Sequence, residues 1–250
     1  IKKIAQAVDR MLCIFPFEPD LLKAHGIQAT FVGHPLANAI PLQPDRLQAR
    51  QALGLPDDAR VLALLPGSRA SEIKYLAKRF VDTARLLARE HPGLKVLLPV
   101  APGLKAMVQA ELQGLEQGPG LMLLDGQSHQ ALAACDVSLV ASGTATLEAA
   151  MFKRPMVIAY AMHPMSWWLT RRKKIQPWVG LPNILAQTFL VPEYLQDQAQ
   201  PEAMAQALHH WLTHPDEVQV LQSRFLSMHH SLQRNTAQSS ADAIQQILDR

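Results

Sequence analysis

Residues 136–158 constrain the fold of this chain most, because they read as strand, tight turn, helix and strand in quick succession. The run 137–140 is short and largely apolar, as expected for a strand buried on both faces of a parallel sheet. Small hydroxyl residues around a glycine at 142–144 then interrupt it, which is typical of a helix N-cap. We expect a compact helix over 146–151 and the next strand over 156–160.

A helix that opens directly from a strand end presents free N–H groups and the positive end of its dipole, an arrangement that binds phosphate. Gly143 lets a ligand approach the backbone, and Ser142 and Thr144 add hydroxyl donors. Glu148 lies one helical turn beyond Thr144, where its carboxylate can accept hydrogen bonds from a ribose diol. The alternative is a plain helix cap with an exposed glutamate.

Strands and helices alternate from Val61 to Tyr160, at the spacing of a doubly wound, Rossmann-like parallel sheet in an α/β fold. The loops at 66–69, 125–127 and 142–144 each follow a predicted strand, so all lie at the carboxyl edge where such sheets bind ligands. Asp125 and Gly126 therefore join the candidate site. Beyond residue 180 the pattern becomes helical, roughly over 201–213, 216–229 and 235–250.

A second phosphate loop is predicted at Pro66-Gly67-Ser68-Arg69. Gly67 permits a tight turn, Ser68 can donate to phosphate, and the planar fork of Arg69 matches a diphosphate. The alternative is an ordinary strand-to-helix turn with an exposed arginine. We expect the helix that follows to begin with Ser71 as its N-cap.

Several motifs of nucleotide and metal chemistry are missing from the sequence. It contains neither G-x-G-x-x-G nor a Walker A motif, and it has no D-x-D or H-E-x-x-H. We therefore expect no metal at the nucleotide site and no cofactor, with Arg69 and helix N-termini neutralising the diphosphate. Cys13 and Cys135 stand alone in apolar surroundings, as buried core residues of a reduced protein do.

Two further segments carry candidate side chains. In the run 181–187, Asn183 and Gln187 place amides one turn apart, suited to sugar hydroxyls or phosphate oxygens, although Asn183 could equally be an N-cap. A second segment mixes aromatic and basic residues, as do surfaces that bind anionic membranes. Nucleic-acid binding and a solvated face with core tryptophans are its alternatives. Its residues are Trp167, Trp168, Arg171, Arg172, Lys173, Lys174 and Trp178.

The length of 250 residues suffices for one large or two modest domains, and the net charge of +3 is too small on its own to indicate a nucleic-acid binder. Residues 1–40 contain only strand, helix and strand, so we expect them to be the remnant of a preceding Rossmann-like domain. We assign 41–230 to a nucleotide-sugar-binding domain and 231–250 to a helix that packs toward the N-terminal domain. Without an initiator methionine or a signal peptide, the sequence is expected to lack an N-terminal portion.

The ordered set of motifs closely resembles the lipid-A-disaccharide synthase family, which are glycosyltransferases of the GT-B fold, over the whole chain. The matching segments are Phe15-Pro-Phe-Glu, Phe31-Val-Gly-His-Pro, Leu64-Leu-Pro-Gly-Ser-Arg, Leu124-Asp-Gly, Ala141-Ser-Gly-Thr-Ala-Thr-Leu-Glu and Leu181-Pro-Asn-Ile-Leu-Ala.

The resemblance implies two Rossmann-like domains, with the UDP-sugar donor held by the C-terminal one. It implies inverting transfer of 2,3-diacylglucosamine from UDP to 2,3-diacylglucosamine 1-phosphate in lipid A and lipopolysaccharide synthesis, by a peripheral protein on the inner face of the cytoplasmic membrane. The acid/base carboxylate is expected in the N-terminal domain, so this chain alone should bind nucleotide without catalysing. His34, at the predicted domain junction, either reaches the substrate or serves only the turn before Pro35.

Two alternatives remain open from the sequence. A UDP-sugar epimerase shares the fold and the phosphate loops, but it would leave the aromatic and basic segment unexplained. A nucleotide- or lipid-binding module without catalysis is the other. The C-terminal helix carries an apolar stripe at Ala241, Ile244, Ile247 and Leu248 that must be covered, and we therefore expect the chain to self-associate.

Overall fold

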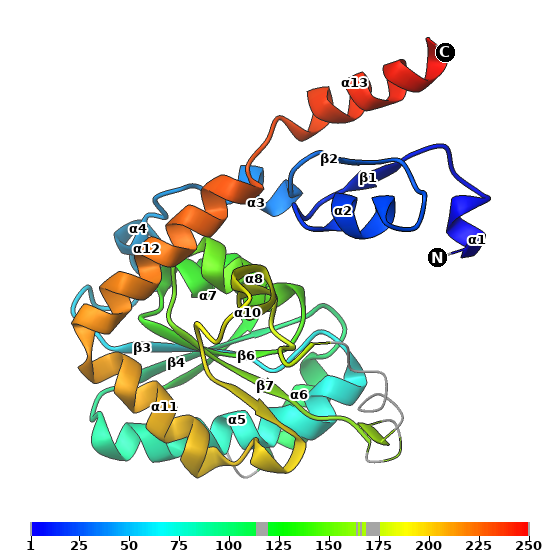
Figure 1. The fold of residues 1–250 in the computed structure, drawn as a ribbon. Coiled ribbons are helices and arrows are strands. Elements are labelled where there is room, and N and C mark those ends of the chain that lie inside the picture. Colours follow the sequence, from blue (N-terminus) through cyan, green and yellow to red (C-terminus); the bar gives the residue numbers. More distant parts are fainter. Residues whose placement is uncertain (1, 114–119, 164, 166, 169–175, 250) are drawn as a thin grey trace. The chain divides into compact units, whose positions relative to one another are not determined.

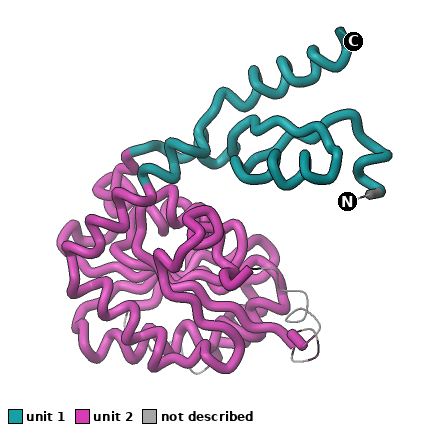
Figure 2. The backbone as a smooth tube through the Cα atoms, in the orientation of Figure 1, with its two compact units in different colours: residues 1–42, 226–250 teal, residues 43–225 magenta. Residues whose placement is uncertain are grey.

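The computed structural model describes residues 2–113, 120–163, 165, 167–168 and 176–249 (Figure 1). The chain divides into two compact units, coloured separately in Figure 2. Unit 1 joins residues 1–42 to 226–250, and unit 2 comprises residues 43–225.

Unit 2 is built on a six-stranded parallel sheet with the strand order β5-β4-β3-β6-β7-β8. The strands are β3 (Val61–Leu65), β4 (Lys95–Val100), β5 (Leu121–Asp125), β6 (Val137–Ala141), β7 (Met156–Tyr160) and β8 (Glu193–Leu195). Every residue of the two central strands, β3 and β6, is buried, as expected for strands covered on both faces. The predicted doubly wound α/β sheet is thereby confirmed.

Helices cover both faces of the sheet (Figure 1). On one face lie α5 (Ala70–Glu90), α6 (Lys105–Glu111) and α11 (Pro201–Thr213). The opposite face carries α4 (Arg46–Ala52), α7 (Ser128–Ala134), α8 (Thr144–Met151) and α10 (Leu181–Ala186). The longest of these, α5, buries a stripe at three- and four-residue steps that includes Ile73, Leu76, Phe80 and Leu87. A short 3-10 turn, η1 (Gln196–Gln198), follows β8.

Strand order reverses between β3 and β6. From β3 the chain proceeds through β4 to β5 on one side, whereas from β6 it proceeds through β7 to β8 on the other. The carboxyl ends of β3 and β6 are neighbours, because Leu65 pairs with Val140. Open α/β sheets bind their ligands at such a switch point.

The amino ends of the same two strands are fixed by a partly buried ion pair, in which the Asp136 side chain is 24% exposed. Arg50 is fully buried, and its Nη2 donates to the Asp136 carboxylate at 2.9 Å. Arg50 also donates to the carbonyl oxygens of Ala134 at 3.0 Å and Asp57 at 2.6 Å. The other partners of Asp136 are the Arg46 guanidinium and the backbone N–H of Val61, the latter at 2.8 Å.

Unit 1 is built from segments at both ends of the chain. It contains the parallel pair β1 (Met11–Cys13) and β2 (Ala29–Phe31) with α1 (Lys2–Ala5), α2 (Glu18–Lys23), α3 (Pro35–Ala39) and α13 (Thr236–Leu248). The helix α12 (Pro215–Leu232) contributes its last turns to this unit. Asn38 donates to the Arg234 carbonyl at 2.7 Å, and a ring nitrogen of His229 lies 2.9 Å from the Ala37 carbonyl oxygen.

Arg50→Ala should lower the free energy of unfolding by at least roughly 1–3 kcal/mol, since it leaves the carbonyl oxygens of Ala134 and Asp57 and one oxygen of Asp136 without their buried donor. Urea unfolding followed by circular dichroism measures the change. Arg85→Ala is the matched control, because Arg85 pairs with Asp82 at 3.7 Å on the surface of α5. That pair should contribute less than about 1 kcal/mol. Equal losses in the two variants would contradict a dominant role for the Arg50–Asp136 pair.

Candidate functional site

A cleft of about 350 Å³ opens at the carboxyl edge of the unit 2 sheet. It brings together most of the predicted nucleotide-binding residues from the loops after β3, β5 and β6. Those that line it are Gly67, Ser68, Arg69, Gly126, Ser142, Gly143, Thr144 and Glu148. The rest of the lining is Leu65, Glu72, Pro99, Val100, Ala101, Pro102, Ser128, Ala141 and Ala145.

The loop after β3 is organised by Glu72, a residue that we did not single out from the sequence. Its Oε2 accepts hydrogen bonds from the backbone N–H groups of Ser68 at 2.9 Å and Arg69 at 3.2 Å. Its Oε1 accepts from the Arg69 guanidinium at 3.0 Å. The N-cap of α5 is consequently Arg69, and our prediction of Ser71 is wrong. The spacing of Glu72 three residues after the cap is the capping-box signal that would have revealed it.

Gly67 is required by this arrangement for two reasons. Its φ is +120°, which residues with a Cβ rarely adopt. A Cβ at this position would also lie 2.5 Å from the Cβ of Glu72. The glycine therefore lets the loop wrap around the Glu72 carboxylate, while the Arg69 side chain stays 79% exposed at the cleft.

The loop after β6 presents the start of α8 to the same cleft. The helix begins at Thr144, two residues earlier than predicted, with Gly143 as its N-cap at φ +152° and ψ −161°. The Ser142 hydroxyl donates to the Val179 carbonyl at 2.9 Å and so helps to hold the loop in place. Thr144 is exposed, and the N–H groups of Thr144 and Ala145 have no intrahelical acceptor. The N–H of Thr146 is already used, since it donates to the Gly143 carbonyl at 3.1 Å.

Glu148 reaches the cleft from the second turn of α8. Its carboxylate lies 3.7 Å from Nε2 of His129, a residue of α7 that the sequence analysis did not identify. The turn before α7 has two residues with positive φ, Gly126 at 68° and Gln127 at 58°. This turn places α7, and with it His129, beside α8. Because α7 and α8 meet only through tertiary packing, sequence spacing gave no signal for the pair.

Asn183 has a structural role instead of the predicted ligand contact. It is fully buried, and its amide nitrogen donates to the Val191 carbonyl and the Glu193 carboxylate, both at 2.9 Å. Its amide oxygen accepts from the N–H groups of Leu190 at 2.8 Å and Val191 at 3.1 Å. These partners use the donors and acceptors of the amide, so a ligand would have to displace one of them.

Three other candidates lie outside the lining of the cleft. Asp125 is exposed at the end of β5, and Gln187 is exposed at the C-cap of α10, with a φ of 53°. His34 belongs to unit 1, where its Nδ1 accepts from the Leu36 N–H at 3.2 Å and caps α3. Burial lowers the pKa of the His34 imidazole, which favours this neutral, accepting form.

The predicted membrane segment is described in part. Trp168 is 53% exposed, and the Trp178 ring meets Phe189 edge-on at 6.2 Å between centroids. Arg171, Arg172, Lys173 and Lys174 lie outside the described residues. Within the part of the chain that the structure describes, no helix combines the length and apolar character that crossing a bilayer requires.

Comparison with known proteins gives a family match over nearly the whole chain. The family model for lipid-A-disaccharide synthetase matches residues 1–247. A lipid-A-disaccharide synthase of Verminephrobacter eiseniae has 56% sequence identity to this chain, and one of Albidiferax ferrireducens has 54%. Each alignment covers 99% of this chain. The chain spans 65% of the length of each of these relatives.

Similar solved structures share the fold at low identity. A UDP-GlcNAc 2-epimerase from Neisseria meningitidis bound to UDP-GlcNAc has a TM-score of 0.63 and 12% identity, over 98% of this chain and 62% of its own. A glycosyltransferase involved in lipopolysaccharide biosynthesis has a TM-score of 0.61 and 14% identity, over 94% and 61%. These likenesses confirm the fold, which transferases and epimerases share.

Proposed function

This chain belongs to the lipid-A-disaccharide synthetase family, and we propose that its cleft is the UDP-sugar donor site of a hexosyltransferase. The full-length enzyme would transfer 2,3-diacylglucosamine from UDP to 2,3-diacylglucosamine 1-phosphate, forming lipid A disaccharide 1-phosphate and releasing UDP with inversion. The observation that carries the site proposal is the convergence of Arg69 and the α8 N-terminus in one cleft at the switch point.

The diphosphate would lie between the Arg69 guanidinium and the first turn of α8. Arg69 is exposed and its present partner is Glu72, so it can exchange the carboxylate for a more highly charged diphosphate. The α8 N-terminus supplies N–H donors and the positive end of the helix dipole. Glu148, whose side chain is only 19% exposed, would accept hydrogen bonds from the ribose hydroxyls. We propose that these groups suffice without a metal.

The epimerase alternative is weaker. Its support is a likeness in fold at 12% identity, whereas the transferase reading has family relatives at up to 56% identity. For the chain by itself, we propose UDP binding without transfer. Inverting transfer needs a base for the acceptor hydroxyl as well as a stabilised leaving group, and the cleft supplies the second of these.

Arg69→Ala should weaken UDP binding about tenfold or more, because a hydrogen bond between charged groups contributes roughly 1.5–3 kcal/mol. Uridine affinity should change little, since uridine lacks the diphosphate. Calorimetric titration of both ligands measures the difference, and Arg89→Ala is the control, an exposed arginine of α5 outside the cleft lining. Equal losses of UDP and uridine affinity would mean that Arg69→Ala acts by disturbing the fold and not by removing a diphosphate contact.

The metal-free site has its own test. Loss of UDP binding by the original chain in EDTA would contradict it.

We also propose that the aromatic and basic segment docks on the anionic inner face of the cytoplasmic membrane, bringing a lipid-linked donor to the cleft. Exposed Trp168 and Phe189 supply apolar surface, and the cations at 171–174 supply charge. Arg171→Glu with Arg172→Glu should reduce co-sedimentation with anionic vesicles and leave UDP affinity unchanged. The control, Arg85→Glu with Arg89→Glu, makes the same charge change on α5. If the original chain and both double variants bind vesicles equally, the segment is a solvated surface and does not dock on the membrane.

Self-association is proposed through α13. Ala243 is buried within unit 1, whereas Ile244 and Leu248 of the predicted stripe are exposed, Leu248 by 78%. Pairing with a second copy would cover these side chains. Sedimentation velocity at several concentrations should show a dimer for the intact chain and a monomer for a chain truncated after Asn235. Identical sedimentation of the two would overturn the proposal.

A further inference from the structure

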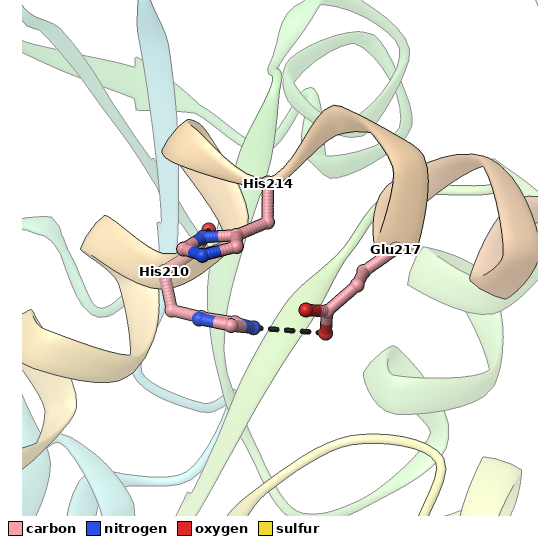
Figure 3. Close-up of side chains that lie close together, drawn as sticks. All are labelled: His210, His214 and Glu217. Atoms are coloured by element: carbon pink, nitrogen blue, oxygen red, sulfur yellow. Dashed lines mark hydrogen bonds and ion pairs between the residues drawn. The ribbon is translucent and has the colours of Figure 1, made fainter.

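A second cluster of side chains lies where α11 ends and α12 begins, outside the lining of the nucleotide cleft (Figure 3). His210 and His214 come from the end of α11 and Glu217 from the first turn of α12. One candidate ligand atom of each residue lies within 4.8 Å of those of the other two. The described residues contain this one group of three such side chains.

The local sequence explains the convergence. His210 and His214 are four residues apart, so they project from one face at the helix end. Pro215 then starts α12, and the short turn returns Glu217 beside His210. His210 Nε2 lies 2.9 Å from Glu217 Oε2, a hydrogen bond that lowers the pKa of the Glu217 carboxyl and keeps it ionised.

The second histidine carries its own supporting contact. Nδ1 of His214 lies 2.9 Å from the carbonyl oxygen of His210 and 3.0 Å from the Thr213 hydroxyl, which itself donates to the His209 carbonyl at 2.9 Å. With the proton on Nδ1 donated to the His210 carbonyl, Nε2 of His214 keeps a free lone pair. Histidines that bind metals usually have this arrangement, in which a backbone carbonyl fixes the tautomer.

The three candidate ligand atoms lie near one another, but the side chains do not have the orientation of a coordinated metal site. The two imidazole rings stack at 4.0 Å and 25°, so their in-plane lone pairs do not yet converge. A tetrahedral ion with bonds of about 2.0–2.1 Å needs ligand atoms about 3.3 Å apart. The side chains of His210 and Glu217 are about half exposed, which leaves room for the rotations that would bring the lone pairs together.

We propose that His210, His214 and Glu217 form a site for a late first-row divalent metal ion, with Zn²⁺ as the best-matched probe. Two imidazoles and one carboxylate suit Zn²⁺, whereas Mg²⁺ and Ca²⁺ prefer oxygen ligands throughout. The ion takes the place of the hydrogen between His210 Nε2 and Glu217, and the His210 proton moves to Nδ1 or to solvent. Bound metal would fasten α11 to α12.

Calorimetric titration of the EDTA-treated, dialysed chain with Zn²⁺ tests the site. We expect one ion per chain and no comparable heat with Mg²⁺. His214→Ala should weaken Zn²⁺ binding at least about tenfold, since even outer-shell partners of a metal contribute roughly 10- to 100-fold. Glu217→Gln should also weaken it, and both variants should keep the far-ultraviolet circular dichroism of the original chain.

His25→Ala is the matched control, because it removes an exposed histidine of unit 1 and leaves the cluster intact. Its Zn²⁺ affinity should equal that of the original chain. A Zn²⁺ affinity that His214→Ala leaves unchanged would overturn the proposal, because the ion would then bind elsewhere. So would equal losses in His25→Ala and His214→Ala, which would indicate unspecific binding by surface histidines.

Discussion

Asp136, which Arg50 holds by an ion pair, joins the amino ends of the two strands whose carboxyl ends carry the cleft. The Asp136 carboxylate accepts from the Val61 N–H, and the Asp136 N–H donates to the Val61 carbonyl, so the starts of β3 and β6 are locked together. The parallel register that follows pairs Leu62 with Val137 and Leu65 with Val140. An error of one residue at the amino ends would reverse which side chains face each layer. It would also separate the two loops at the carboxyl ends.

Within the cleft, the positive charge of Arg69 is already in place and is balanced by a neighbouring carboxylate. Arg69 is paired with Glu72, whose carboxylate also binds two backbone N–H groups of the same loop. The carboxylate thus shapes the loop and keeps the guanidinium at the cleft before a ligand arrives. If the cleft binds a diphosphate as we propose, that ligand would compete for one contact of Glu72 and leave the other two. We infer that ligand exchange at Arg69 costs little reorganisation of the backbone, because Gly67 and the capped start of α5 stay in place.

The sequence predicted what depends on local pattern, and it missed what depends on tertiary contact. Apolar runs located β3 and β6, and glycines with hydroxyl residues located both loops, because these signals lie within a few residues. The internal role of Asn183 was not readable from the sequence, since its partners Val191 and Glu193 are supplied by a later loop and strand. The contact between His129 and Glu148 was also missed, because these residues lie on different helices, α7 and α8. The His210–His214–Glu217 cluster was also missed, although its spacing of four and three residues is readable once the turn at Pro215 is known.

The two carboxylates that line the cleft, Glu72 and Glu148, are poor candidates for the base that inverting transfer needs. Glu72 already accepts three hydrogen bonds, two from backbone N–H groups and one from the Arg69 guanidinium, so its carboxylate oxygens are engaged in holding the loop. Glu148 is proposed to hold the ribose, away from the acceptor hydroxyl. If both serve the donor, the base must approach the sugar from the opposite side, as in-line displacement at the anomeric carbon requires. We therefore propose that the base is supplied by the part of the full-length relatives that this chain does not span, and that this cleft contributes binding and leaving-group stabilisation.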